Sequence, residues 1–220
     1  MKQVKQVRVK PAPDNGVELL HYAKVLEDIA GKPFKCGEST HIPGTVQVEY
    51  TPNASSETYF ADNIAYIVSS QTGAPVLTIE RAKVPSEIEA EWLGYIVKNN
   101  IVFEGQINPI EICVGYMITS TDGHERFVWV LKAKAAPSPD GASTKTGSIA
   151  FKNANYTMNC AMSAAVECFR IKVDTSALPE GVTREMLHEK WFTDPEWAIS
   201  IADKEALPTE PTEPPEPPVG

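Results

Sequence analysis

A regular alternation of polar and apolar residues constrains the fold of this chain more than any other feature. In residues 153–162 one face would carry Tyr156, Met158, Cys160 and Met162. The opposite face would carry Asn153, Asn155, Thr157 and Asn159. A period of two is typical of a β-strand with one buried and one wet face. The pattern therefore predicts a half-buried strand whose outer face is polar and uncharged.

The same period recurs in residues 45–50. Val46, Val48 and Tyr50 would share the buried face, and the outer face would present Thr45, Gln47 and Glu49. After the loop-like TPNASSE, the stretch SSETYFADNIAYIVSS (55–70) predicts a long second strand that forms a tall hairpin with residues 45–50. Within that strand Ala61-Asp62-Asn63 is expected to allow a bend.

Residues 16–28 fit a strand or a short helix, and His21 to Val25 favour the strand. Further strands are expected at residues 75–83 and 165–175. Asp122-Gly123 predicts a two-residue turn between EICVGYMITST and RFVWVLKAKA, since both positions tolerate positive φ. In the second arm of this hairpin, the residues expected on one face are Phe127, Trp129, Leu131 and Ala133. About seven strands are predicted in all.

One helix is well marked. Ser86 and Glu89 match a capping box behind Pro85, and Asn99-Asn100 would end the helix. An apolar stripe at helical spacing, expected to pack on a sheet, consists of Ile88, Trp92, Leu93 and Ile96. A second, short helix is expected in GVTREMLHEKW, with Trp197 and Ile199 docking behind it.

Composition excludes several classes of protein. The 220 residues are 42% hydrophobic, which is enough for a core, and the net charge of −9 argues against a surface that grips nucleic acid. The N-terminus lacks the apolar core of a signal peptide, and no apolar run approaches a membrane span. The four cysteines are too scattered for a disulfide scaffold, so buried or half-buried thiols are expected.

No catalytic or metal-binding pattern stands out. The four histidines are dispersed, no serine lies in a nucleophile elbow, and Glu87, Glu89 and Glu91 fit a solvated helix face. We therefore expect no enzyme activity, no metal and no cofactor.

The predicted strands point instead to assembly. Long hairpins with one polar face expose sheet edges, and exposed edges aggregate unless they are covered. Closing the sheets of several subunits into a ring removes the edges, and head-to-tail contacts produce rings or filaments.

Several segments resemble the major tail protein family of phages with long non-contractile tails. They are Leu20 to Val25, Tyr59-Phe60-Ala61-Asp62-Asn63, the Asp-Gly hairpin with its Arg-Phe-Val-Trp-Val return strand, and the loop ending Thr-Lys-Thr-Gly-Ser-Ile. The resemblance covers about residues 16–164, in the family's order. Residues 165–206 depart from the family's pattern, and a Pro/Glu-rich tail stands where some relatives carry an immunoglobulin-like domain.

The resemblance implies a mainly β fold, a β-sandwich or open barrel with one packed helix, a long hairpin loop and extended arms. Its domains would be an N-terminal arm (1–15), the tail tube domain (16–164), an extension with a strand and a short helix (165–206), and a flexible tail (207–220). The helix would lie outside the sheet, and the loop at residues 50–58 would contact the next ring.

The function that the resemblance implies is structural. Six copies would form a ring, and stacked rings would make a tube that conducts phage DNA during ejection. Partners would be other copies of the chain, the tail terminator, the tape measure and baseplate proteins, with DNA as transient cargo and no membrane. The protein would be made in the bacterial cytoplasm and reside in the virion tail.

Two surfaces are candidates for these contacts. The strand expected to pair across the subunit boundary contains Tyr59, Phe60, Asp62, Asn63 and Tyr66. The lumen would be lined by Asn153, Asn155, Thr157 and Asn159, or alternatively by Thr45, Gln47 and Glu49. A different interpretation, a β-sandwich adhesin or binding module at the host-facing end of a virion, would need an aromatic platform beside exposed polar residues.

Overall fold

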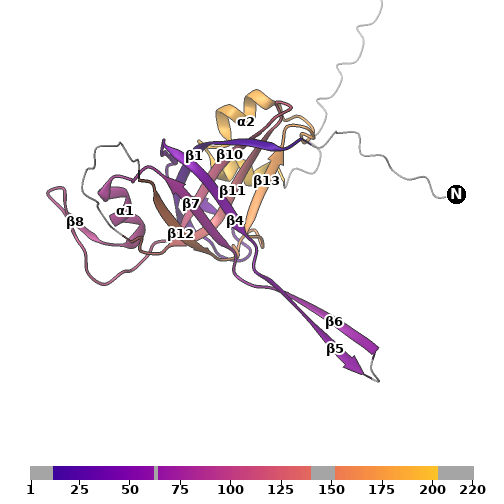
Figure 1. Ribbon diagram of the computed structural model, residues 1–220. Helices are drawn as coiled ribbons and strands as arrows, with labels where there is room; N and C mark the ends of the chain where they lie inside the picture. The colour runs from indigo at the N-terminus through magenta and orange to yellow at the C-terminus, as the bar shows by residue number, and fades with distance from the viewer. Residues whose placement is uncertain (1–11, 62–63, 140–151, 203–220) are drawn as a thin grey trace, which may run out of the picture.

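The computed structural model describes residues 12–61, 64–139 and 152–202, and in these ranges it is mainly β (Figure 1). The helices are α1 (Ser86–Leu93), α2 (Arg184–Lys190) and α3 (Pro195–Ser200). The strands are β1 (Asp14–Glu27), β2 (Lys35–Cys36), β3 (Thr40–His41), β4 (Thr45–Thr51), β5 (Ala54–Ala61), β6 (Ile64–Thr72), β7 (Val76–Arg81), β8 (Ile96–Lys98), β9 (Ile101–Phe103), β10 (Ile112–Ser120), β11 (Glu125–Ala135), β12 (Ala154–Cys160) and β13 (Arg170–Asp174).

A nine-stranded antiparallel sheet forms the body of the protein. Its strand order is β2-β1-β10-β11-β12-β7-β4, with β3 paired to β1 and β13 paired to β11. β12 pairs with the C-terminal part of β11, at residues 133–135, and β13 pairs with residues 126–130. The prediction of a mainly β chain is confirmed, although the described strands number thirteen rather than about seven because several are short.

The sheet curls around an inner core as an open barrel. This core takes buried residues from β1, β7, β10, β11 and β12, and half-buried Val48 and Tyr50 from β4. Helix α1 packs against it through Trp92, whose indole meets the rings of Tyr22 and Tyr156 edge-on. Trp92 therefore packs on the sheet as predicted, and Ile88 lies half-buried against the same core.

A second core lies on the other face of β10 and β11. Phe127 and Trp129 project into it, and Phe192, between α2 and α3, packs its ring against both. The Trp129 Nε1–H donates to the Trp191 carbonyl at 2.7 Å, which fixes the end of α2 on the sheet. Trp197 and Ile199 pack against this core as predicted.

A β-bulge in β11 reverses the alternation of its side chains between the two cores. Ile112 pairs with Ala133 and Val114 with Val130, so Leu131 and Lys132 together face one residue of β10. Beyond the bulge the alternation is reversed. Ala133 therefore lies in the inner core rather than on the face of Phe127 and Trp129, and that part of the prediction is wrong.

The hairpin between β10 and β11 is confirmed, but its turn is longer than predicted. Ser120 donates its N–H to the His124 carbonyl, and Gly123 donates to the Ser120 carbonyl. Gly123 alone in this turn has a positive φ, of 83°. The connection therefore has three residues, with glycine in the left-handed position that such loops favour.

Helix α1 differs from its prediction at both ends. Its N-cap is Pro85 and no side chain caps it, so Ser86 is not the cap. It ends at Gly94, whose φ of 72° is left-handed and where a Cβ would collide with the Asn108 carbonyl. Ile96 therefore lies beyond the helix, exposed on β8, and its predicted packing on the sheet is wrong.

The tall hairpin is also arranged differently. Residues 54–61 pair with residues 64–72, so β5 and β6 pair with each other and most of TPNASSE belongs to β5. β4 pairs instead with β7. Figure 1 shows the β5–β6 hairpin projecting from the body. The predicted single strand with a bend is thus wrong, because its central residues connect two antiparallel strands.

Asp28 anchors the segment after β12 to the end of β1. Its buried carboxylate accepts hydrogen bonds from Lys132 Nζ (2.8 Å), Ser163 Oγ (2.8 Å) and the Ala165 N–H (2.9 Å). Burial raises the pKa of this carboxyl, but the hydrogen bonds from Lys132, Ala165 and Ser163 outweigh it and lower the pKa to about 2.

We expect Asp28→Asn to lower the free energy of unfolding at neutral pH by roughly 2 kcal/mol. Because the pKa of Asp28 is lower in the folded state, its stabilisation is fully present above about pH 4 and is lost as the pH falls toward 2. Urea unfolding at several pH values should therefore show that the free energies of unfolding of Asp28→Asn and of the unmodified protein converge as the pH falls toward 2. Glu38→Gln, at an exposed position, is the control, and a constant difference down to pH 2 would contradict the assignment.

Candidate functional site

The two groups of polar residues predicted from alternation meet on one surface. β7 lies between β4 and β12, and its register places Gln47 and Asn155 on either side of Glu80. Glu49 and Thr157 flank Thr78 in the same way. The two groups were alternatives in the sequence, and the structure joins them through β7. We call this surface the polar face: Gln47, Glu49, Thr51, Thr78, Glu80, Asn155, Thr157 and Asn159.

Packing on the inside of the barrel determines which residues lie on the polar face. Tyr156, Met158 and Cys160 of β12 and Leu77 and Ile79 of β7 are buried in the inner core. The residues between them must point the other way, because neighbouring side chains of a strand alternate. Asn155, Thr157 and Asn159 are accordingly exposed, while Met162, beyond the end of β12, is exposed rather than buried as predicted.

β4 follows its predicted alternation only in part. A register shift between Thr45 and Gln47 interrupts its pairing with β7. Thr45 is half-buried and its Oγ1 is enclosed, whereas Val46 is exposed. Thr45 is therefore not an outward residue and Val46 is not a core residue, while Gln47 and Glu49 are exposed as predicted. The bulge is the physical reason, because it changes which face each residue occupies.

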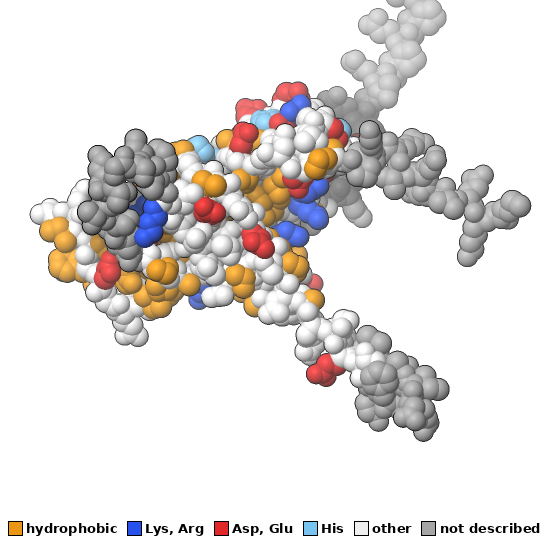
Figure 2. All heavy atoms as spheres, in the orientation of Figure 1, with side chains coloured by type: hydrophobic (Ala, Val, Ile, Leu, Met, Phe, Trp, Pro, Cys, Tyr) orange, Lys and Arg blue, Asp and Glu red, His pale blue; other side chains and the backbone are white. Residues whose placement is uncertain are grey.

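The polar face carries carboxylates, amides and hydroxyls. None of its residues from β4, β7 and β12 is a lysine or an arginine. Asn153, just before β12, donates from Nδ2 to Glu80 Oε1 at 2.8 Å. Lys134 of β11 lies opposite Asn159, and its Nζ is paired with Glu111 at 3.3 Å. Over the region where Figure 1 places β4, β7 and β12, Figure 2 shows mostly white atoms with acidic and hydrophobic side chains among them, and basic side chains at the borders.

Arg81, the one cation within β4, β7 and β12, points inward. It is buried, with Nη2 donating to the Pro43 carbonyl at 2.6 Å and Nε to the Ala82 carbonyl at 2.9 Å. These bonds attach the loop before β4 to the end of β7. Arg81 thus contributes no positive charge to the polar face.

The polar face ends at an unpaired strand edge. β4 is the last strand of the sheet, and among the described residues only β7 pairs with it. A groove of about 250 Å³ separates its start from β1, lined by residues 17–20 and 41–45. β4 contains neither lysine nor proline, the residues that commonly protect an edge strand. Its outer N–H and C=O groups can therefore pair with another chain.

The other predicted contact residues belong to the β5–β6 hairpin and lie apart from the polar face. In its ladder Tyr59 pairs with Ile67 and Phe60 with Ala65, which leaves Tyr66 as the extra residue of a bulge. Asp62 and Asn63 lie outside the described residues. The hairpin extends away from the body in Figure 1, so the structure does not bring β5 and β6, which contain Tyr59, Phe60 and Tyr66, to the polar face.

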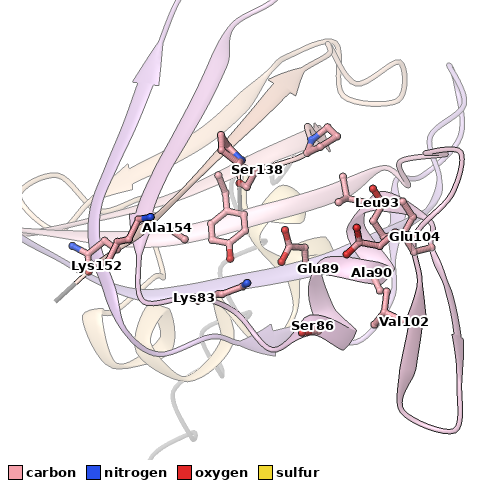
Figure 3. A pocket seen from close by; sticks show the side chains of 15 residues that line it. Lys83, Ser86, Glu89, Ala90, Leu93, Val102, Glu104, Ser138, Lys152 and Ala154 are labelled. Carbon is pink, nitrogen blue, oxygen red and sulfur yellow. The ribbon is translucent and has the colours of Figure 1, made fainter. Parts of the chain in front are cut away.

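A cleft of about 370 Å³ lies beside α1 (Figure 3). Lys83, Glu89 and Lys152 line it together with the Tyr156 ring, whose hydroxyl accepts a hydrogen bond from the Val84 N–H at 3.1 Å. Charges of both signs surround the cleft, and the Tyr156 oxygen is engaged with the backbone. Of the other hydroxyls in the lining, Ser138 Oγ donates to the Asn155 carbonyl at 2.6 Å.

Other titratable groups hold structural elements together. The Glu125 carboxylate receives two hydrogen bonds from Arg184 (2.6 and 2.9 Å) and lies 2.8 Å from His188 Nε2. The bonds from Arg184 and His188 keep the pKa of Glu125 below its usual value despite partial burial. This cluster attaches α2 to the base of β11. In the described ranges no three metal-ligating residues converge.

The cysteines behave as predicted. Cys113 and Cys160 are buried, and Cys36 and Cys168 are half-buried free thiols. Cys36 and Cys113 lie 3.9 Å apart through sulfur, but they belong to strands on opposite sides of β1. Two strands that flank a third have their Cα atoms too far apart for a disulfide.

The sequence matches no protein-family model and no curated protein. Among the described residues, no helix has the length and apolar character needed to cross a membrane.

The outward direction of the polar face can be tested by paired substitutions. Thr157→Lys should change the free energy of unfolding by less than about 0.5 kcal/mol, because the new charge is in water. Met158→Lys, one residue further along β12, should cost several kcal/mol because Met158 is fully buried. Urea unfolding measures both, and equal costs would show that the faces of β12 are wrongly assigned.

Proposed function

We propose that this protein is a tail tube subunit, which assembles into hexameric rings that stack into a hollow tube conducting phage DNA during ejection. The observation that carries the proposal is the polar face across three strands with an unpaired strand edge at its border. The number of subunits and the identity of the assembly derive from the family resemblance of residues 16–164. The same resemblance underlies the proposed location in the virion tail and the tail terminator, tape measure and baseplate partners.

The chemistry of the polar face suits the lining of a DNA channel. A wall with lysine or arginine would bind phosphates, since each contact releases counterions. Glu49, Glu80 and the amides of β12 offer no such contact. An acidic or neutral wall repels DNA or lets it slide.

The unpaired edge of β4 supports assembly. In a ring, the sheet of one subunit can continue into that of the next, which satisfies the exposed N–H and C=O groups of the edge. Head-to-tail contacts of this kind close into rings when the rotation permits.

The β5–β6 hairpin supports stacking. It projects beyond the body in Figure 1, where it could reach a subunit of an adjacent ring. A two-stranded ribbon alone in water is only marginally stable, so a partner surface would stabilise it. This assigns to β5 and β6 the contact role that the resemblance implies for residues 50–58.

The adhesin interpretation receives no comparable support. Of the large apolar residues exposed in the described ranges other than residues 59–69, Phe103 is the only aromatic, and it lies on β9 rather than on the polar face. An aromatic platform beside the polar residues is therefore not among the described features.

We expect the purified protein to form rings or tubes with a central channel as its concentration rises. Light scattering coupled to size exclusion, with negative-stain electron microscopy, would detect them. A monomer or trimer at all concentrations would overturn the tube and favour a discrete binding module.

Positive charge added to the polar face tests the channel itself. Asn155→Lys combined with Thr157→Lys should slow DNA ejection several-fold while tubes still form, because the new cations contact phosphate. Ejection can be followed by the fluorescence of a DNA-binding dye. Glu189→Lys, on the exposed side of α2, adds positive charge elsewhere and should leave the rate unchanged. Normal ejection through the doubly substituted tube would show that this face does not line the lumen.

A further inference from the structure

Two of the four histidines face each other, and neither has an acidic partner. The rings of His21 on β1 and His41 on β3 have their centroids 4.8 Å apart. The other two histidines lie beside carboxylates, His124 at 3.8 Å from the aspartate of its own turn and His188 at 2.8 Å from Glu125. A carboxylate favours the protonated form of a histidine, whereas a second histidine opposes it once both carry a charge. The facing pair is therefore the one that resists protonation.

The ring of His21 is enclosed where three elements meet. It stacks on Phe192, in the connection between α2 and α3, with the ring centroids 4.9 Å apart and the planes 13° apart. Its Nδ1 lies 3.2 Å from Ser39 Oγ, just before β3. The residue opposite it on β10 is Gly115. His21 is half-buried while His41 is exposed, so a proton on His21 would place a charge between packed surfaces.

These contacts attach β3 to the rest of the protein. His21 and His41 are partners in the short ladder between β1 and β3, and the Ile42 N–H donates to the Leu20 carbonyl at 2.8 Å. β3 has only two residues, so few backbone hydrogen bonds hold it. Ile42, buried in the inner core, anchors its end. Through its stacking on Phe192, His21 links β3 to the layer of α2 and α3 as well as to β1.

We propose that the His21–His41 pair is an acid-sensitive latch, in which uncharged rings hold β3 on β1 at neutral pH and protonation of His21 releases β3 in acid. Histidine is the side chain whose ordinary charge change falls in this pH range. The latch concerns a single chain, so it does not depend on the tube.

The protonation of His21 is shifted to acid pH by its surroundings. Burial, and then the charge of His41, lower the pKa of His21 from 6.5 to about 4. Among the described residues, His41 is the one group whose charge shifts this pKa, because Phe192, Ser39 and Gly115 are uncharged. The Phe192 ring attracts a cation and acts in the opposite direction.

The sign of the pH dependence follows from this lowered pKa. The released ring binds a proton more readily than the latched ring, so the latch is fully stabilised above about pH 6.5 and loses stability as the pH falls toward 4. Asp28 loses its stabilisation in a more acidic range, as its pKa is about 2. The two effects can therefore be separated by pH.

Hydrogen exchange at the Ile42 amide tests the latch, because this N–H bonds to β1. In the full-length protein its protection factor, taken relative to the intrinsic exchange rate at each pH, should fall roughly tenfold between pH 7 and pH 5. His21→Gln removes the titrating ring and should abolish this fall, while the matched control His124→Gln should retain it. Equal protection at both pH values in the unmodified protein, or an undiminished fall in His21→Gln, would overturn the latch.

The pKa of His21 provides a second measurement, by NMR titration of its ring C–H groups. His41→Gln changes an exposed residue, so the fold should be kept, and the loss of its charge should raise the pKa of His21 toward 6.5. A pKa of 6.5 or above in the unmodified protein would show that the latched ring accepts a proton freely, which contradicts the proposal. An unchanged pKa in His41→Gln would show that the two rings do not act as a pair.

Discussion

Burial of β11 on both faces is the constraint on which the rest of the structure depends. Val128 and Val130 face the inner core, whereas Phe127, Trp129 and Leu131 face the second core beneath α2 and α3. The backbone N–H and C=O groups of a strand buried on both sides must find hydrogen-bond partners within the sheet. Those of β11 pair with β10, β12 and β13. Alternation along residues 127–131 lets one strand serve both cores, and the bulge at residues 131–132 turns Ala133 and Ala135 to the inner core.

The polar face follows from this arrangement. The second core is covered by the segment after β13, so the remaining outer surface of the barrel belongs to β4, β7 and β12. These strands bury one side and expose the other. The exposed side carries amides, hydroxyls and carboxylates, interrupted by Val76 between Thr51 and Asn159. Because Arg81 is held inside by backbone carbonyls, the outer positions of these strands are free of cations. The proposal of a tube rests on this wall and on the open edge of β4.

Local signals predicted the elements well and their partners less well. The alternation in β12 and the turn signal at Gly123 were sufficient because they depend on neighbours in the chain. Ile96 was misplaced because a helical period was continued past Gly94, where a close approach by Asn108 ends the helix. Ala133, Thr45 and Val46 were misplaced because a bulge reverses a face without leaving a mark in the alternation.

The sequence by itself determined that the chain is mainly β, that β12 has a wet and uncharged side, and that Trp92 packs inward. Each of these follows from side-chain chemistry at a fixed spacing along one element. Only the tertiary structure decided that β4 and β12 share β7, that β5 pairs with β6, and that α2 and α3 close the second core. Which distant segments pair depends on how all the strands compete for a neighbouring strand and for a place in a core. The pattern of residues within one segment therefore does not predict its partner.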